Sequence, residues 1–216
     1  MTGRSAPELL ILHAVRLLGF ANSATVAERA GASHDDTLRV LREAERAGWV
    51  QHVEFADLGG WSLTDSGKAE NERQLAVERG GADPENRIAT VYRAFIPLNA
   101  RLLRAVTDWQ IRPTGEDRFA PNDHADATWD GRVLAELDTL NDTLPPLIAR
   151  LAQVLARFDG YDIRFAAALR RAQGGQRDWV DKTHIDSCHR VWFQLHEDLV
   201  ATLGIDRGTE NTAASW

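Results

Sequence analysis

The chain has 216 residues, of which 44% are hydrophobic and 26% are charged, and its formal net charge is −7. This composition predicts a soluble globular protein of one large or two small domains. It excludes a disordered chain and a membrane-spanning run of roughly 20 apolar residues. A single cysteine excludes an intrachain disulfide and a zinc site built from cysteines. Glu8, His13 and Arg16 interrupt the apolar N-terminus, so we expect no secretory signal and a cytoplasmic location.

The first third of the chain predicts three helices, a β-hairpin and a fourth helix. Pro7 suits the first turn of a helix, and Ser23, Ser33 and Thr64 each stand where they can cap a following helix. Two alternating runs on either side of residues 57–60 predict the hairpin. The expected helices span residues 7–21, 24–30, 34–47 and 64–78, and the expected strands span 49–55 and 61–63.

The remaining two thirds of the chain predict helices and loops only. Gly80-Gly81-Ala82 marks the boundary. Pro97 predicts a kink or break just before it, and Pro145-Pro146 predicts the start of a separate helix. Thr183 with Asp186 three residues later resembles a capping box. The expected helices span residues 85–111, 128–143, 145–158, 162–172 and 183–203, with a loop at 112–127.

The order of elements in residues 8–78 resembles the MarR-type winged helix-turn-helix transcription regulators of bacteria. The resemblance is carried by ATVAERAGASHDDTLRVLREAERAGWV and, after the hairpin, by SLTDSGKAENER. The predicted fold is therefore mainly α, with a winged helix-turn-helix of three helices plus a β-hairpin wing, followed by an all-α helical-bundle domain. The expected domains are residues 1–80 and 83–207, followed by a frayed tail at 208–216.

The resemblance implies a homodimer that binds double-stranded DNA, with the second helix of the motif in the major groove. Carried onto this sequence, the residues expected to contact DNA are Ser33, His34, Thr37, Arg39 and Arg42. His34 and Thr37 can donate hydrogen bonds to bases or phosphates, and Arg39 can make a bidentate contact with guanine. The sequence therefore predicts a DNA-binding transcription regulator.

Acidic residues leave a second use of the same fold open. Asp35 and Asp36 stand where phosphates would approach, and the wing tip at residues 56–60 has no arginine or lysine. Residues 1–80 hold nine basic and twelve acidic side chains, whereas DNA-binding domains usually carry a basic face. The alternative is a winged-helix interaction or accessory module that binds a protein partner and no DNA.

A second resemblance covers nearly the whole chain. The runs PNDHAD and DWVDKTHIDSCHRVWFQLHEDLVATLGIDR, after the winged helix, resemble a two-part module of uncharacterised actinobacterial regulators. The resemblance implies a module that occurs alone and beside pyruvate phosphate dikinase-like or phosphoenolpyruvate-utilising domains. The resemblance implies a regulatory or interaction module and assigns no residue roles.

Aromatic residues of the C-terminal part either belong to its core or line a pocket for a small-molecule effector. Tryptophan suits either place, because it supplies a large apolar area and one polar group. The residues expected to line such a pocket are Tyr92, Trp109, Trp129, His189 and Trp192.

The polar residues near the C-terminus predict no catalytic or metal site. His189 and His196 are two helical turns apart and follow His184, and they could hold a metal only if residues of the 112–127 loop came near. The chain has no HExxH pair, GxSxG elbow or phosphate-binding glycine loop. We expect Cys188 to be an isolated buried thiol. We therefore expect no metal, no cofactor and no enzymatic activity.

Overall fold

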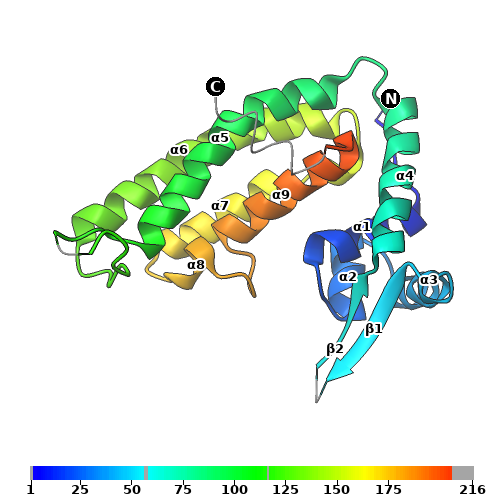
Figure 1. Ribbon diagram of the computed structural model, residues 1–216. Coiled ribbons are helices and arrows are strands. Elements are labelled where there is room, and N and C mark those ends of the chain that lie inside the picture. Colours follow the sequence, from blue (N-terminus) through cyan, green and yellow to red (C-terminus); the bar gives the residue numbers. More distant parts are fainter. Residues whose placement is uncertain (1, 56–57, 116, 206–216) are drawn as a thin grey trace. The chain divides into compact units, whose positions relative to one another are not determined.

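The computed structural model describes residues 2–55, 58–115 and 117–205, which fold into two compact units (Figure 1). The described residues of the N-terminal unit fall within Met1–Glu85, Leu155–Arg157 and Glu197–Trp216, and those of the helical unit fall within Asn86–Val154 and Phe158–His196. No described helix is long and apolar enough to cross a membrane. The predicted tail at 208–216 lies outside the described residues.

The N-terminal unit begins with three helices, followed by a hairpin and a fourth helix. These elements are α1 (Pro7–Leu18), α2 (Ser23–Ala30), α3 (His34–Arg46), β1 (Val50–Phe55), β2 (Leu58–Leu63) and α4 (Asp65–Ala82). The strands are antiparallel, with Val50 opposite Leu63. Apolar side chains of α1, α2, α3 and the hairpin form one buried core, which includes Ile11, Leu12, Val15, Val26, Val40, Leu41, Val50 and Trp61. This part of the prediction is confirmed at the level of its elements.

Two of the three predicted helix caps are confirmed. The Ser33 hydroxyl accepts a hydrogen bond from the Asp36 N–H at 3.1 Å, and the Thr64 hydroxyl accepts one from the Gly67 N–H at 3.0 Å. The predicted cap at Ser23 is wrong, because the Asn22 side chain accepts from the Thr25 N–H at 2.9 Å and α2 begins at Ser23. An Asn side chain caps as well as Ser does, so the sequence allowed either residue.

The start of α4 is bound tightly to the turn between α3 and β1. The hydroxyls of Thr64 and Ser66 donate to the Gly48 carbonyl at 2.6 and 2.7 Å, and the Thr64 N–H donates to the Trp49 carbonyl at 3.0 Å. Gly67 lies against the same turn. A Cβ atom on Gly67 would lie 1.7 Å from the Trp49 carbonyl oxygen, so only glycine allows α4 to approach this closely.

A buried charge network lies inside the N-terminal unit. The carboxylate of Asp198 forms an ion pair with Arg157 and lies 3.1 Å from Nε2 of His13. His13 Nδ1 lies 3.2 Å from Oδ1 of Asn71 on α4. Arg157 also donates to the carboxylate of Glu78, at 3.2 Å. The network therefore joins α1 and α4 to the short segment at 155–157 and to the C-terminal end of the chain's last described helix.

Asp198 is almost fully buried, with 1% of its side chain exposed. Burial by itself would favour the neutral carboxyl, but Arg157 and His13 outweigh it and hold the pKa of Asp198 below its ordinary value. Burial likewise opposes the charge on Arg157, and Asp198 and Glu78 raise its pKa in spite of it. Both groups are therefore buried in their charged forms, and each depends on the other.

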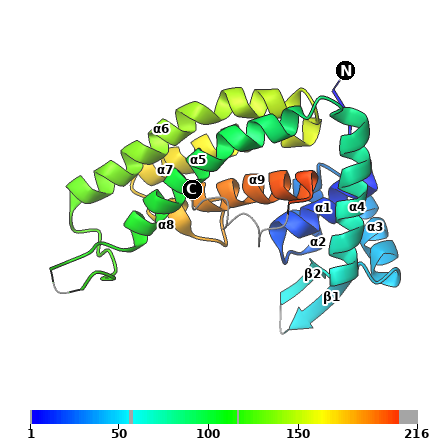
Figure 2. The same ribbon diagram turned by 45° about the horizontal axis from the view of Figure 1, so that its top comes forward.

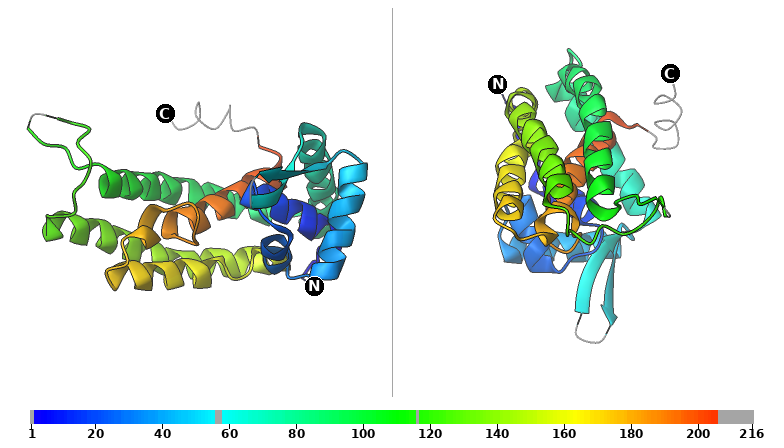
Figure 3. Two further views of the ribbon diagram at one scale, coloured as in Figure 1. Left: turned by 90° about the horizontal axis from the view of Figure 1, so that it is seen from below. Right: turned by 90° about the vertical axis from the view of Figure 1, so that its left-hand side faces the viewer.

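The helical unit is built on two long helices that pack side by side (Figure 2). Its elements are α5 (Arg87–Gln110), α6 (Ala127–Ala152), α7 (Tyr161–Gln173), the short α8 (Asp178–Asp181) and the first part of α9 (Cys188–Leu203). A 3₁₀ turn at Ala156–Phe158 lies between α6 and α7. The chain between α5 and α6 turns at one end of this unit (Figure 3), and α6 packs against α7.

Prolines do not divide the helices of this unit. α5 continues through Pro97, and α6 continues through Pro145 and Pro146, so the prediction of separate helices at 128–143 and 145–158 is wrong. Pro145 and Pro146 are exposed, and water can therefore reach the carbonyls that lose their donors. Buried side chains recur at helical spacing before and after the prolines, at Leu137, Leu140, Leu144, Ile148 and Leu151, and their burial holds the helix together.

The last helix begins five residues later than expected. Ser187 caps α9, because its hydroxyl accepts from the Arg190 N–H at 3.1 Å. The expected start at Thr183 is wrong, since the Asp186 carboxylate accepts from Arg164 at 2.8 and 2.9 Å and does not close a capping box. The C-terminal part of α9, from Glu197, belongs to the N-terminal unit. The two units are therefore interleaved in sequence, whereas the predicted division at residues 80–83 is a single cut.

Candidate nucleic-acid interface

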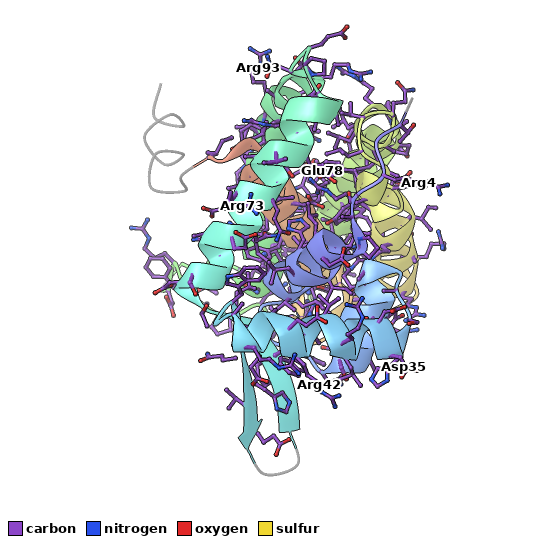
Figure 4. All side chains as sticks on the ribbon, turned by 90° about the vertical axis from the view of Figure 1, so that its right-hand side faces the viewer. Arg4, Asp35, Arg42, Arg73, Glu78 and Arg93 are labelled. Carbon is purple, nitrogen blue, oxygen red and sulfur yellow. The ribbon has the colours of Figure 1, made fainter. Side chains whose placement is uncertain are left out.

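The outer face of α3 presents a row of charged side chains around a shallow groove. Asp35 and Arg42 lie on this helix, whereas Arg73 lies on α4 and does not line the groove (Figure 4). The helix can expose this face because Val40, Leu41 and Ala44 occupy its buried side. The residues that line the groove are Asp35, Leu38, Arg39, Arg42, Glu43 and Arg46.

The five residues expected to contact DNA differ in what they can reach. Ser33, His34, Arg39 and Arg42 are exposed. Ser33 is occupied as the cap of α3 and also donates to Asp36 at 2.7 Å, and His34 Nε2 lies 2.9 Å from the Ser23 hydroxyl. Thr37 is fully buried, and its hydroxyl donates to the Ser33 carbonyl at 2.8 Å. Thr37 therefore supports the helix and is removed from the candidate interface.

The arginines of α3 are not equivalent. Arg39 forms ion pairs within its own helix, with Glu43 at 3.3 Å and with Asp36 at 3.9 Å. About half or more of each of these side chains is exposed, and such pairs contribute only about 0.3–0.5 kcal/mol. Arg42 and Arg46 make no hydrogen bond or ion pair with any described residue. Arg46 was not among the residues expected to contact DNA, although it lies one turn after Arg42 on the same helix face.

The hairpin adds polar but little cationic surface to this unit. Gln51, His52, Val53 and Glu54 of β1 are exposed. The His52 ring packs on Trp61, with ring centroids 4.5 Å apart. Residues 56–57 of the expected wing tip lie outside the described residues. His52 Nδ1 also lies 3.8 Å from the Glu54 carboxylate.

No protein-family model, curated protein or solved structure matches this chain. What the protein does must therefore follow from its own side chains and their surroundings.

The aromatic residues expected to line an effector pocket do not form one pocket. Tyr92 and Trp192 are buried with Phe95, whose ring centroid lies 5.0 Å from that of Trp192. Trp109 is also buried, and its position on α5 is about 21 Å along the helix from Phe95. Tyr92 and Trp192 thus belong to one part of the core and Trp109 to another. His189 is half-buried and lies on α9. Trp129 lines a groove between α5 and α6.

The histidines and carboxylates of the helical unit do not gather as metal ligands. His124 Nδ1 lies 3.0 Å from the Asp130 carboxylate, and its ring packs on Trp109. His196 packs near Phe95, and His184 lies in the turn before α9. Within residues 2–55, 58–115 and 117–205, no three His, Cys, Asp or Glu side chains are arranged to hold a metal ion.

Cys188 should be unreactive in the folded protein. Its side chain is buried, and burial raises the pKa of its thiol from about 9 to about 12. The thiolate fraction at neutral pH is then about a thousandfold lower than for an ordinary cysteine. A thiol-specific disulfide reagent should therefore react negligibly with the native protein and with one equivalent after unfolding in urea. Rapid reaction of the native protein would restore Cys188 as a candidate nucleophile.

Proposed function

We propose that the protein is a DNA-binding transcription regulator. In this proposal the N-terminal unit is a winged helix-turn-helix, and α3 enters the major groove with its exposed face toward the bases. The observation that carries the proposal is the row of Arg39, Arg42 and Arg46 along that face, two of which have no partner among the described residues. Guanidinium groups of this kind bind phosphate oxygens and the major-groove edge of guanine.

The carboxylates around these arginines weaken general affinity for DNA but do not prevent specific contacts. The residues assigned to the N-terminal unit include 11 basic and 18 acidic side chains, so at long range the unit as a whole is repelled by the phosphate backbone. Breaking the surface pairs of Arg39 costs only a few tenths of a kcal/mol. A good bidentate contact with a base contributes about 1–3 kcal/mol of discrimination. Base contacts therefore dominate, and the proposed protein is selective and weakly held on random DNA.

A dimer follows from the same proposal. A single α3 helix with this charge balance contacts too few base pairs for stable binding. Two copies would bind two half-sites about 34 Å apart, one turn of the double helix. The proposed homodimer thus reads a sequence with approximate two-fold symmetry.

Arg42→Ala and Arg46→Ala should each weaken DNA binding roughly tenfold or more, because each removes a cation from the proposed contact face. DNA fragments that the wild-type protein selects from a random library serve as the probe, and binding is measured by gel shift at fixed salt. Arg73→Ala is the matched control, since Arg73 is an exposed arginine of α4 in the same unit. The control should bind as the wild type does.

A protein-interaction module is the second candidate. The exposed Asp35, Asp36 and Glu43 beside the arginines favour a partner with charges of both signs. Selection that enriches no DNA sequence, or Arg42→Ala and Arg46→Ala variants that bind the selected DNA as well as Arg73→Ala, would reject DNA binding through α3.

A further inference from the structure

A groove on the helical unit lies between α5 and α6. The lining residues recur at spacings of three and four on both helices, so each wall is one face of a helix. The groove is open to solvent on one side and has a volume of about 390 Å³, which lies within the range of roughly 300–1,000 Å³ typical of small-molecule sites. The lining residues are Arg101, Arg104, Ala105 and Asp108 of α5, and Trp129, Arg132, Val133 and Glu136 of α6.

Hydrogen bonds between the two helices bridge the groove at two levels. At one level Arg101 donates to both carboxylate oxygens of Glu136, at 2.7 and 3.1 Å. At the other level the indole N–H of Trp129 donates to the backbone carbonyl of Asp108 at 2.6 Å. Arg101 and Asp108 are about 10 Å apart along α5. The two bridges therefore hold the walls together on either side of a space about two helical turns long.

Two further cations line this space beside Arg101. Arg104 and Arg132 are exposed, and neither makes a hydrogen bond or ion pair with any described residue. The Arg132 guanidinium lies 4.8 Å from the centre of the Trp129 ring, and this cation–π contact holds it over the aromatic face. Glu136 already neutralises Arg101. With Asp108 as the remaining carboxylate, the groove carries a net positive charge in a chain of net charge −7.

The hydrogen bond from Arg101 holds the pKa of Glu136 below its ordinary value against partial burial, and Arg104 adds to this effect from further away. Glu136 is thus fully charged at neutral pH and remains paired with Arg101. A ligand that enters the groove does not need to displace this pair, because Arg104 and Arg132 make no hydrogen bond or ion pair with a described residue.

We propose that this groove binds a small molecule through its phosphate group. The tetrahedral phosphate can accept hydrogen bonds from Arg104 on one wall and Arg132 on the other at the same time, whereas a planar carboxylate matches a single guanidinium fork. Ala105 and Val133 are buried and form an apolar floor. Asp108 favours ligands that carry a hydroxyl or amino donor beside the phosphate. The ligand class is therefore a small phosphate ester with a polar donor.

The test uses glycerol 3-phosphate as the probe, with glycerol and inorganic phosphate for comparison, at constant ionic strength. Binding to the full chain is followed by calorimetry and by the rise in unfolding temperature. Glycerol 3-phosphate should bind saturably and more tightly than either fragment. Arg104→Gln and Arg132→Gln should each weaken binding about tenfold or more, as expected for the loss of a charge-assisted hydrogen bond.

Arg150→Gln is the matched control, because Arg150 is an exposed arginine of α6 that does not line the groove. It should leave the affinity unchanged. An equal loss in this variant, or no saturable binding by the wild-type protein, would overturn the proposal. The measurement involves no DNA, so its failure is distinct from failure of the proposed function.

Discussion

Gly67→Ala should lower the free energy of unfolding of the N-terminal unit by about 3–5 kcal/mol. The added Cβ would lie 1.7 Å from the Trp49 carbonyl oxygen, 2.6 Å from its carbon and 2.9 Å from its Cα, all of them backbone atoms. Backbone cannot rotate aside as a side chain can, so α4 must move away from the turn. That movement also breaks the hydrogen bonds from Thr64 and Ser66 to the Gly48 carbonyl.

Gly80→Ala is the matched control, because it makes the same change in the same helix. A Cβ on Gly80 meets no atom within 4 Å, and alanine favours a helix over glycine by roughly 0.5–1 kcal/mol. This variant should therefore be as stable as the wild type or slightly more so. Urea unfolding followed by circular dichroism gives the size of both effects, and hydrogen exchange locates them. A Gly67→Ala protein with wild-type stability would show that α4 does not contact the Trp49 carbonyl.

Asp198→Asn should lower the free energy of unfolding by about 3–5 kcal/mol at pH 7, because it leaves Arg157 charged and buried without its closest carboxylate. The side chains of Asp198 and Arg157 are 1% and 4% exposed, so water cannot replace the lost partner. Glu70→Gln is the control. It breaks an ion pair with Arg73, at 2.7 Å, but 64% of the Arg73 side chain is exposed, and such pairs contribute about 1 kcal/mol or less.

The difference in stability between the wild type and Asp198→Asn should also depend on pH. The folded protein holds the pKa of Asp198 below its ordinary value, so its carboxylate stabilises the folded state fully above the unfolded pKa of about 4. As pH falls below about 4, the unfolded chain takes up a proton before the folded one does. The difference should then shrink. A difference that grew on acidification would contradict the ionised state of Asp198.

Short-range patterns in the sequence were sufficient to predict much of the N-terminal unit. Ser33 and Thr64 cap helices only a few residues away, and the alternating runs around 57–60 form a hairpin between adjacent segments. Glycine after α2 and α3 marks their ends. These features depend on neighbours within about four residues, and local chemistry decides them.

Features that join distant parts of the chain could not be predicted in this way. α6 continues through Pro145 and Pro146 because its buried leucines pack against other helices, and that packing outweighs the local effect of proline. Three of the residues expected in one pocket, Tyr92, Trp109 and Trp192, are instead buried in two parts of the core. The groove between α5 and α6 depends on Arg101 meeting Glu136, 35 residues later.

The sequence by itself determined the order of helices and strands in the first 80 residues. It also determined which arginines of the candidate DNA-binding helix are exposed, because helical spacing alone places Arg39 and Arg42 on a different side from the buried Leu41. Only the tertiary structure decided that Thr37 is buried, that Arg46 has no partner among the described residues, and that Asp198 lies with His13 and Arg157 in a buried network. The physical reason is burial. Any local sequence pattern predicts that a charged side chain is exposed, because the partners that allow its burial lie dozens of residues away in the chain.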